Sequence, residues 1–149
     1  MKEITTYLTF DGDCREAMTF YGKCLGAELQ LMPFSEAPGN FPKEAKDRIM
    51  HARLAKGATL LMASDTTDCK TFQQGSNFSV SVQCESVPEI ERLYAAFSEN
   101  GKTTMPLHDA FWGARFGMLT DHWPGCERPD LDIQASRFSS RRFPYPSIP

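Results

Sequence analysis

The sequence predicts an α+β fold built from two βαβββ modules. Three observations predict it: short segments in which apolar and polar residues alternate, two segments with an apolar residue every three or four positions, and a repeat of their order along the chain. The modules span residues 4–65 and 77–121. One amphipathic helix covers only one face of a sheet, so the other face must cover something, and a curved mixed sheet that lines a ligand cleft is one solution.

The first module begins with a strand at Ile4–Phe10, which is rich in β-branched and aromatic residues and stops at a turn around Gly12. From Cys14 onward the apolar residues recur at helical spacing up to Gly26, a C-terminal stop signal, and this predicts a helix. Asp13 immediately precedes this helix and is predicted to be its N-cap.

Three strands follow the first helix. Ala27–Phe34 is the first of them, and a loop containing Pro and Gly comes after it. Arg48–Ala55 and Ala58–Ala63 are two short apolar runs, and only the pair Lys56-Gly57 separates them. A two-residue connection that contains Gly predicts a β-hairpin.

The second module opens on the clearest alternation in the chain, at Asn77–Cys84, which predicts a strand. Ser86 and Glu89 then have the spacing of a capping box, and the helix that they start is predicted to end near Gly101. Two further strands are predicted at Thr103–Leu107 and Ala114–Thr120.

Composition narrows the function classes. The 149 residues carry a net charge of −3, so no global positive field attracts nucleic acid or an anionic membrane. No stretch approaches the roughly 18 consecutive apolar residues of a membrane span, and no signal-peptide core precedes the first strand. The five cysteines are odd in number and widely spaced, which favours reduced packing thiols. We therefore expect a cytoplasmic protein with no nucleic-acid or membrane partner.

Four stretches resemble a known family. They are YLTFDGDCREAMTFYGKCLGAEL at Tyr7–Leu29, DRIMHARL at Asp47–Leu54, LLMASD at Leu60–Asp65 and MPLHDAFWGARFGMLTD at Met105–Asp121. With these stretches in this order, the chain resembles the PhnB-like branch of the vicinal oxygen chelate (glyoxalase/bleomycin resistance/dioxygenase) superfamily. The resemblance implies a glyoxalase-like fold of paired βαβββ modules, assembled as a homodimer.

The C-terminal segment departs from that family. We expect a glyoxalase-like domain at residues 1–121 and a divergent segment at residues 122–149. Pro124 and Pro129 oppose a central strand directly after Asp121, because neither residue can donate a ladder hydrogen bond. The run Leu131–Ala135 is a candidate replacement for the last strand, with the rest of the segment as an arm.

His51, within IMHARL, is the residue that the resemblance implies as a metal ligand. Metal-dependent members of the superfamily hold a divalent cation, a Lewis acid, with His, Glu or Gln side chains from several strands. A competent site needs about three protein ligands, and the strands at Ile4–Phe10 and Asn77–Cys84 offer only hydroxyl and amide groups. A further ligand would lie on the closing strand, where Glu127 or Asp132 are weak substitutes for it. Three roles stay open for His51: a hydrogen-bonded cleft histidine, a metal ligand, or a direct ligand contact without metal.

A second candidate site lies in the run FWGARF. Phe111, Trp112 and Arg115 can form a pocket wall whose guanidinium binds a carboxylate or phosphate in a bidentate manner. The alternative is a loop that packs its aromatic residues into the core and leaves Arg115 at the surface. The sequence alone does not separate the two.

Three functions are consistent with these features. The first is binding of a small anionic or aromatic molecule in the cleft without a full metal site. The alternative is a divalent-metal-dependent enzyme of glyoxalase or dioxygenase type that uses His51. The third is a sheet surface that serves mainly for dimerisation. Names of relatives often mention a demethylubiquinone methyltransferase, but no Gly-rich turn after a strand offers a site for a methyl donor.

Overall fold

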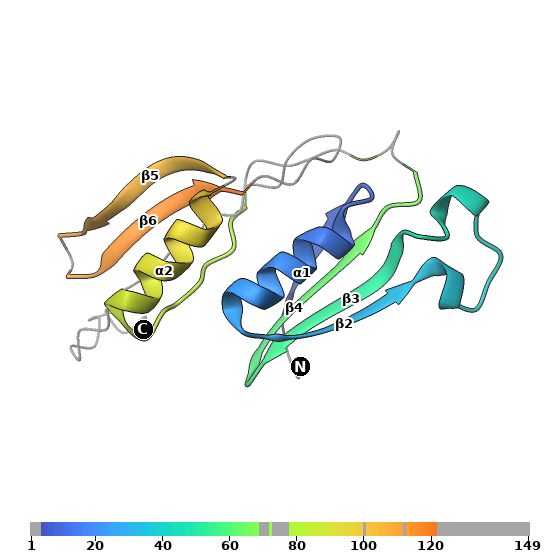
Figure 1. Cartoon of the computed structure of the whole chain (residues 1–149), viewed down its shortest axis with the longest axis horizontal. Coiled ribbons are helices and arrows are strands. Elements are labelled where there is room, and N and C mark those ends of the chain that lie inside the picture. Colours follow the sequence, from blue (N-terminus) through green and yellow to red (C-terminus); the bar gives the residue numbers. More distant parts are fainter. Residues whose placement is uncertain (1–3, 69–71, 73–77, 100, 112, 122–149) are drawn as a thin grey trace, which may run out of the picture. The chain divides into compact units, whose positions relative to one another are not determined.

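A computed structural model describes residues 4–68, 72, 78–99, 101–111 and 113–121 of the chain (Figure 1). The described residues divide into two compact units. The first unit holds those up to Phe78 together with Asp121, and the second holds those from Ser79 to Thr120.

The first unit is a complete βαβββ module, as predicted. Its four-stranded sheet has the order β1-β4-β3-β2, in which β1 is parallel to β4 and the other neighbours are antiparallel. Its elements are β1 (Thr6–Phe10), α1 (Cys14–Leu25), β2 (Glu28–Pro33), β3 (Ile49–Lys56) and β4 (Thr59–Asp65), with 3-10 turns at Phe34–Glu36 and Lys43–Ala45 between β2 and β3.

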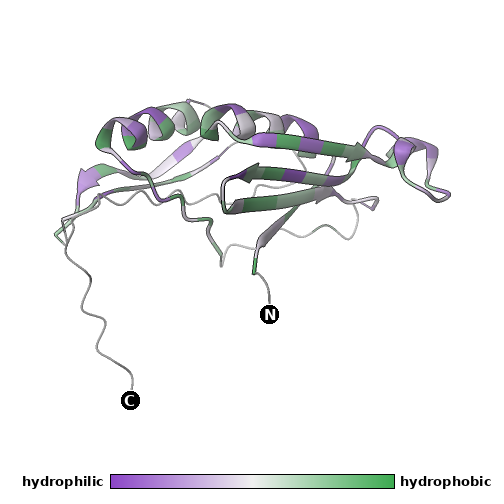
Figure 2. Ribbon diagram, turned by 90° about the horizontal axis from the view of Figure 1, so that it is seen from below, coloured by the Kyte–Doolittle hydropathy of each residue, from purple (hydrophilic) through white to green (hydrophobic). Residues whose placement is uncertain are grey.

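Helix α1 packs on one face of this sheet, against β2, β3 and β4. Figure 2 shows apolar and polar residues alternating along the strands, as a sheet with one covered face requires. Ala17, Met18 and Tyr21 are the buried side of the helix. Gly22 allows a close approach, because a Cβ there would lie 3.3 Å from the Leu54 side chain.

The N-terminus of α1 is held by a residue from the far end of the module. Asp13 occupies the predicted N-cap position, but its side chain makes no capping hydrogen bond. Asp65, the last residue of β4, accepts hydrogen bonds at Oδ1 from the backbone N–H of Gly12 (2.8 Å) and Cys14 (3.0 Å). Its Oδ2 accepts from the N–H of Ile49 at 2.7 Å. The predicted cap was therefore right in position and wrong in chemistry.

The second unit contains α2 (Val87–Ser98) packed on a two-stranded antiparallel sheet of β5 (Lys102–Asp109) and β6 (Arg115–Thr120). The predicted N-cap is confirmed, since the Ser86 hydroxyl accepts from the N–H of Glu89. The Glu89 carboxylate in turn accepts from the N–H of Glu85. The two predicted strands of this unit are present, and both helices begin where the sequence places them.

The strand predicted at Asn77–Cys84 is wrong over its described part, because Phe78–Cys84 has no strand assignment. Alternation is present, with Val80 and Val82 half-buried and Cys84 buried. A strand, however, also needs a ladder partner. In the first unit β1 pairs only with β4, the strand that closes the module. The corresponding closing strand would follow β6, in residues 122–149, which lie outside the described residues together with the candidate run Leu131–Ala135.

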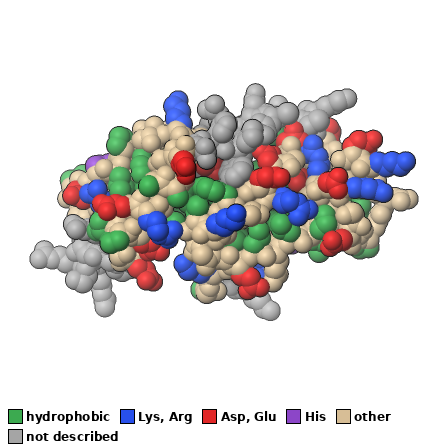
Figure 3. All heavy atoms as spheres, viewed as in Figure 1, with side chains coloured by type: hydrophobic (Ala, Val, Ile, Leu, Met, Phe, Trp, Pro, Cys, Tyr) green, Lys and Arg blue, Asp and Glu red, His purple; other side chains and the backbone are tan. Residues whose placement is uncertain are grey.

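The described residues show neither a surface patch of one charge on the side in view (Figure 3) nor a membrane-spanning helix, as the composition predicts. On the side seen in Figure 3, acidic and basic side chains are interspersed and form no patch of one sign. No helix in the described part of the chain is long and apolar enough to cross a bilayer.

We predict that Asp65→Ala destabilises the protein by roughly 3 kcal/mol or more, because three backbone donors then lose their acceptor. Asp65→Asn should cost about 2 kcal/mol, since it keeps the shape but loses the charge and one acceptor oxygen. Urea unfolding measures both values. The control is Asp47→Ala, at an exposed position, which should stay within about 0.5 kcal/mol of the wild type. Equal stability of the Asp65 and Asp47 variants would contradict this assignment.

Candidate functional site

The face of the first sheet that α1 leaves uncovered contains His51. Leu29 and Leu54 lie on the α1 side, because a Cβ on Gly22 of the helix would touch both. Side chains alternate between the faces along a strand, so His51 and Arg53 lie on the opposite side from Leu54. Burial agrees, since Leu54 is 2% exposed whereas Arg53 is exposed and His51 is half-buried.

Strand register gives the neighbours of His51 on this face. Tyr7 is paired with Met62, Met62 with Arg53, and Arg53 with Gln30, so one row of side chains crosses all four strands. His51 is paired with Met32 in the next row. We call this surface the His51 face; it comprises Thr5, Tyr7, Thr9, Glu28, Gln30, Met32, His51, Arg53, Ala55, Leu60, Met62 and Ser64.

The His51 face is accessible and chemically mixed. Tyr7 is 47% and Met32 is 38% exposed. The hydroxyl oxygen of Tyr7 lies 3.5 Å from His51 Nδ1, a long contact, and the two rings are 6.1 Å apart. When the imidazole proton is on Nε2, the hydroxyl donates to Nδ1 and Nε2–H is left as a donor. Such a pair can bind a polar ligand atom while the methionines contact an apolar group.

The described side chains that surround His51 within the first unit do not form a ligand set for a divalent metal. Its partners on this face are the Tyr7 phenol and the Met32 thioether, which are poor ligands for Zn²⁺ or other borderline divalent ions. Asp65 lies on the α1 side, and its carboxylate holds three backbone N–H groups. Within residues 4–121, less the gaps noted above, no group of three or more His, Cys, Asp or Glu side chains is arranged to hold a metal.

Arg115 lies on the helix-covered side of the β5–β6 sheet. A Cβ on Gly117 would meet the Tyr94 ring of α2 at 2.7 Å, and Arg115 shares the parity of Gly117 along β6. The guanidinium of Arg115 forms ion pairs with Glu91 on α2 (3.2 Å) and Asp109 on β5 (3.4 Å). These ion pairs give Arg115 carboxylate partners within its own unit, and the two roles left open by the sequence both stay predictions.

The aromatic candidate site also includes Phe111 and Trp112. Phe111 is 97% exposed, and Trp112 is outside the described residues. His51 belongs to the first unit, whereas Phe111 and Arg115 belong to the second. A single site built from all of them stays a prediction.

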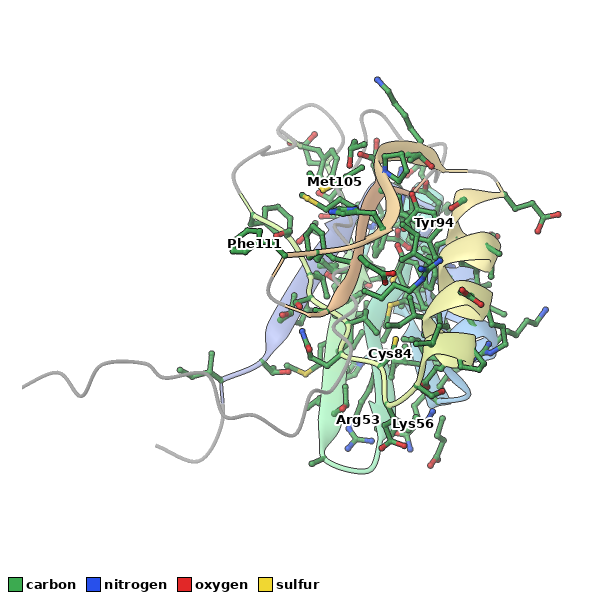
Figure 4. All side chains as sticks on the ribbon, turned by 90° about the vertical axis from the view of Figure 1, so that its left-hand side faces the viewer. Arg53, Lys56, Cys84, Tyr94, Met105 and Phe111 are labelled. Carbon is green, nitrogen blue, oxygen red and sulfur yellow. The ribbon has the colours of Figure 1, made fainter. Side chains whose placement is uncertain are left out.

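The second sheet also has a face turned away from α2, which sequence reasoning missed. The rings of His108 and Phe116 meet edge to face at 6.0 Å across β5 and β6. Met105, which is paired with Met118, is 38% exposed (Figure 4). The alternation along β6 could have predicted this face, because it places Phe116 and Met118 on the side opposite the positions that face the helix.

The thiols and one carboxyl that could carry chemistry have structural surroundings. Cys14, Cys24 and Cys84 are buried, as predicted for packing cysteines. Burial raises the pKa of Cys14, and it raises the pKa of Cys84 to about 11, so both stay protonated at neutral pH. Tyr21 donates a hydrogen bond to Asp121, and both residues are buried. None of these groups has the exposure of a nucleophile or general base.

Comparisons with known proteins agree with this architecture. A family model described as 3-demethylubiquinone-9 3-methyltransferase matches residues 2–125. Protein PA1353 from Pseudomonas aeruginosa is 38% identical, with a TM-score of 0.80 over 92% of this chain and 98% of that one. A putative 3-demethylubiquinone-9 3-methyltransferase, PhnB protein, from Bacillus cereus is 25% identical, with a TM-score of 0.72 over 92% and 100% of the two chains.

Two further matches extend the comparison. Protein YjdN of Escherichia coli (strain K12) is 29% identical over 132 residues, which cover 79% of this chain and 87% of that protein. A glyoxalase/bleomycin resistance protein/dioxygenase family enzyme from Burkholderia phytofirmans is only 11% identical, but its TM-score is 0.59 over 89% of this chain and 95% of that one. This last match shows that the glyoxalase-like fold is shared.

We predict that Arg115→Met lowers the free energy of unfolding by about 1 kcal/mol or less, because the partner carboxylates of Glu91 and Asp109 are 52% and 67% exposed. Chemical unfolding measures this change. The variant should also keep whatever thermal stabilisation small anions give to the wild type. Loss of that stabilisation, with an unchanged unfolding free energy, would instead assign Arg115 to ligand binding.

Proposed function

The chain belongs to the 3-demethylubiquinone-9 3-methyltransferase family, a PhnB-like branch of the glyoxalase/bleomycin resistance/dioxygenase superfamily, and we propose that it binds a small anionic or aromatic molecule on the His51 face without a full metal site. The observation that carries the proposal is the chemistry of that face. A histidine and a tyrosine in contact lie beside Met32 and Met62 on a sheet surface that α1 leaves uncovered.

The placement of these groups suits binding. They project from strands whose positions are set by main-chain pairing and by α1 on the other side, so little ordering is needed when a ligand arrives. Polar groups that fix orientation, set among apolar contacts, are typical of small-molecule sites.

Methyl transfer is not part of the proposal, although the family's description mentions it. The sequence has no Gly-rich turn between a strand and a helix that would bind a nucleotide-type methyl donor. A fold shared across a superfamily does not decide the reaction. Metal-dependent chemistry at His51 is the alternative that the test below addresses.

The proposal includes a homodimer in the cytoplasm. A βαβββ module presents one uncovered sheet face, and a second copy is one way to enclose a ligand there. Light scattering after size exclusion should give 33.6 kDa, twice the 16.8 kDa of one chain. A mass of 16.8 kDa across the micromolar range would contradict the dimer.

The binding test uses thermal melts with a panel of benzoate, phenyl phosphate, 4-hydroxyphenylacetate and their neutral amides or alcohols. A compound present at 100 times its Kd should stabilise the wild type by about 2.7 kcal/mol. We expect His51→Ala to lose this stabilisation. The matched control, His108→Ala, removes a histidine of the second unit and should keep it.

Elemental analysis of the same preparations separates the two functions. Binding without metal in the wild type supports the proposal. Stoichiometric zinc, nickel or manganese that is lost in His51→Ala but retained in His108→Ala would overturn it in favour of a metal-dependent enzyme.

A further inference from the structure

We propose that Arg53 is the specificity-determining residue of the His51 face, and that it selects small organic molecules with an oxyanion group, carboxylate or phosphate, joined to an apolar body. This inference rests on the proposed function, because it names the class of ligand that the same face takes. Sequence reasoning assigned the anion contact to Arg115 and gave Arg53 no role.

Arg53 stands at the centre of the sheet on this face. It is on β3, paired with Met62 of β4 on one side and with Gln30 of β2 on the other. Its side chain is exposed. A ligand that follows the row from Tyr7 to Gln30 therefore passes over the Arg53 position.

Arg53 differs from Arg48 and Arg115 in its partners. Arg48 forms an ion pair with Asp11 at 2.6 Å and also donates to the carbonyl of Thr66. Arg115 has two carboxylate partners. Within the described part of the chain, Arg53 makes neither an ion pair nor a side-chain hydrogen bond. Its five N–H donors are available to an oxyanion, which a guanidinium binds in a bidentate manner.

The one acidic side chain on this face determines where the oxyanion lies. Glu28 is paired with Ala55, two residues after Arg53, and it accepts a hydrogen bond from Gln30 at 3.3 Å. Repulsion by Glu28 favours an anion on the opposite side of Arg53, toward His51. His51 and Arg53 are two residues apart on one strand, which is roughly 7 Å.

The neighbouring side chains define the rest of the ligand. The His51–Tyr7 pair can bind a hydroxyl or carbonyl oxygen about 7 Å from the oxyanion. Met62 lies between Tyr7 and Arg53, so one thioether lines the path between the two polar ends, and Met32 adds a second apolar contact beside His51 on β2. An aromatic or aliphatic body over flexible methionines satisfies both ends, whereas inorganic phosphate reaches only one.

The experiment compares an acid with its neutral isostere: 4-hydroxyphenylacetate and 4-hydroxyphenylacetamide, with phenyl phosphate as the phosphate arm. Isothermal titration calorimetry gives the affinity of each compound for the wild type, Arg53→Gln and Arg53→Lys. The matched control is Lys56→Gln, which removes the same charge from the same strand on the α1 side, where Lys56 donates to the carbonyl of Leu25 (Figure 4).

We expect the wild type to prefer an acid over the amide by about 10-fold or more, as charge-assisted hydrogen bonds allow. Arg53→Gln should weaken the acid by that factor and leave the amide unchanged, Arg53→Lys should restore part of the preference, and Lys56→Gln should keep all of it. Stronger binding of phenyl phosphate than of the carboxylate assigns the ligand to the phosphate class, and the reverse to the carboxylate class.

The outcomes against the inference are distinct from those against the proposed function. Equal binding of acid and amide by the wild type, or an unchanged preference in Arg53→Gln, overturns the role of Arg53 and leaves small-molecule binding intact. Failure of the wild type to bind any of the three compounds contradicts both. Thermal melts verify that the Arg53 and Lys56 variants are folded, which is expected because both side chains are exposed.

Discussion

The described part of the first module depends on the carboxylate of Asp65. Asp65 is the last residue of β4, the strand between β1 and β3. Its two carboxylate oxygens accept hydrogen bonds from the β1–α1 turn, from the first turn of α1 and from the first residue of β3. This buried carboxylate accepts three backbone hydrogen bonds and lies at the positive end of the helix dipole, and both interactions stabilise its charge. The same contact sets the start of β3, and His51 follows Ile49 by two residues. The position of the candidate site thus depends on a residue that is not part of it.

The face of the first sheet that α1 covers decides which side chains are left for ligand binding. The helix buries Leu54 and Ala52, and alternation then places His51 and Arg53 on the other side without any further determinant. The same rule applied to β6 places Arg115 under α2, where it meets Glu91, and not on the face with Phe116. Its place among the aromatic residues of FWGARF made Arg115 the anion-ligand candidate in the sequence. Alternation along β3 instead places Arg53 on the His51 face, where it has no carboxylate partner among the described residues, whereas Arg115 has two.

Features decided within a few residues were predictable, and features decided by distant partners were not. The hairpin at Lys56-Gly57, the helix after Ser86 and the stop at Gly26, which has the positive φ of 62°, are local. The cap of α1 comes from Asp65, 51 residues away from Cys14, and no local pattern contains it. Burial does alternate along Phe78–Cys84, as the sequence indicates. A β-strand, however, also needs hydrogen bonds to a partner strand, and that partner can be distant in the sequence.

The divergence predicted for residues 122–149 would bear on the two modules unequally. Every strand that carries the His51 face lies between Thr6 and Asp65, and each of them has its ladder partners within that range. The pairing that holds the His51 face together therefore lies within the described residues of the first module. The second module is different, since its described sheet has two strands where the first has four. A change in the C-terminal segment is thus expected to alter completion of the second sheet long before it alters the chemistry at His51 and Arg53.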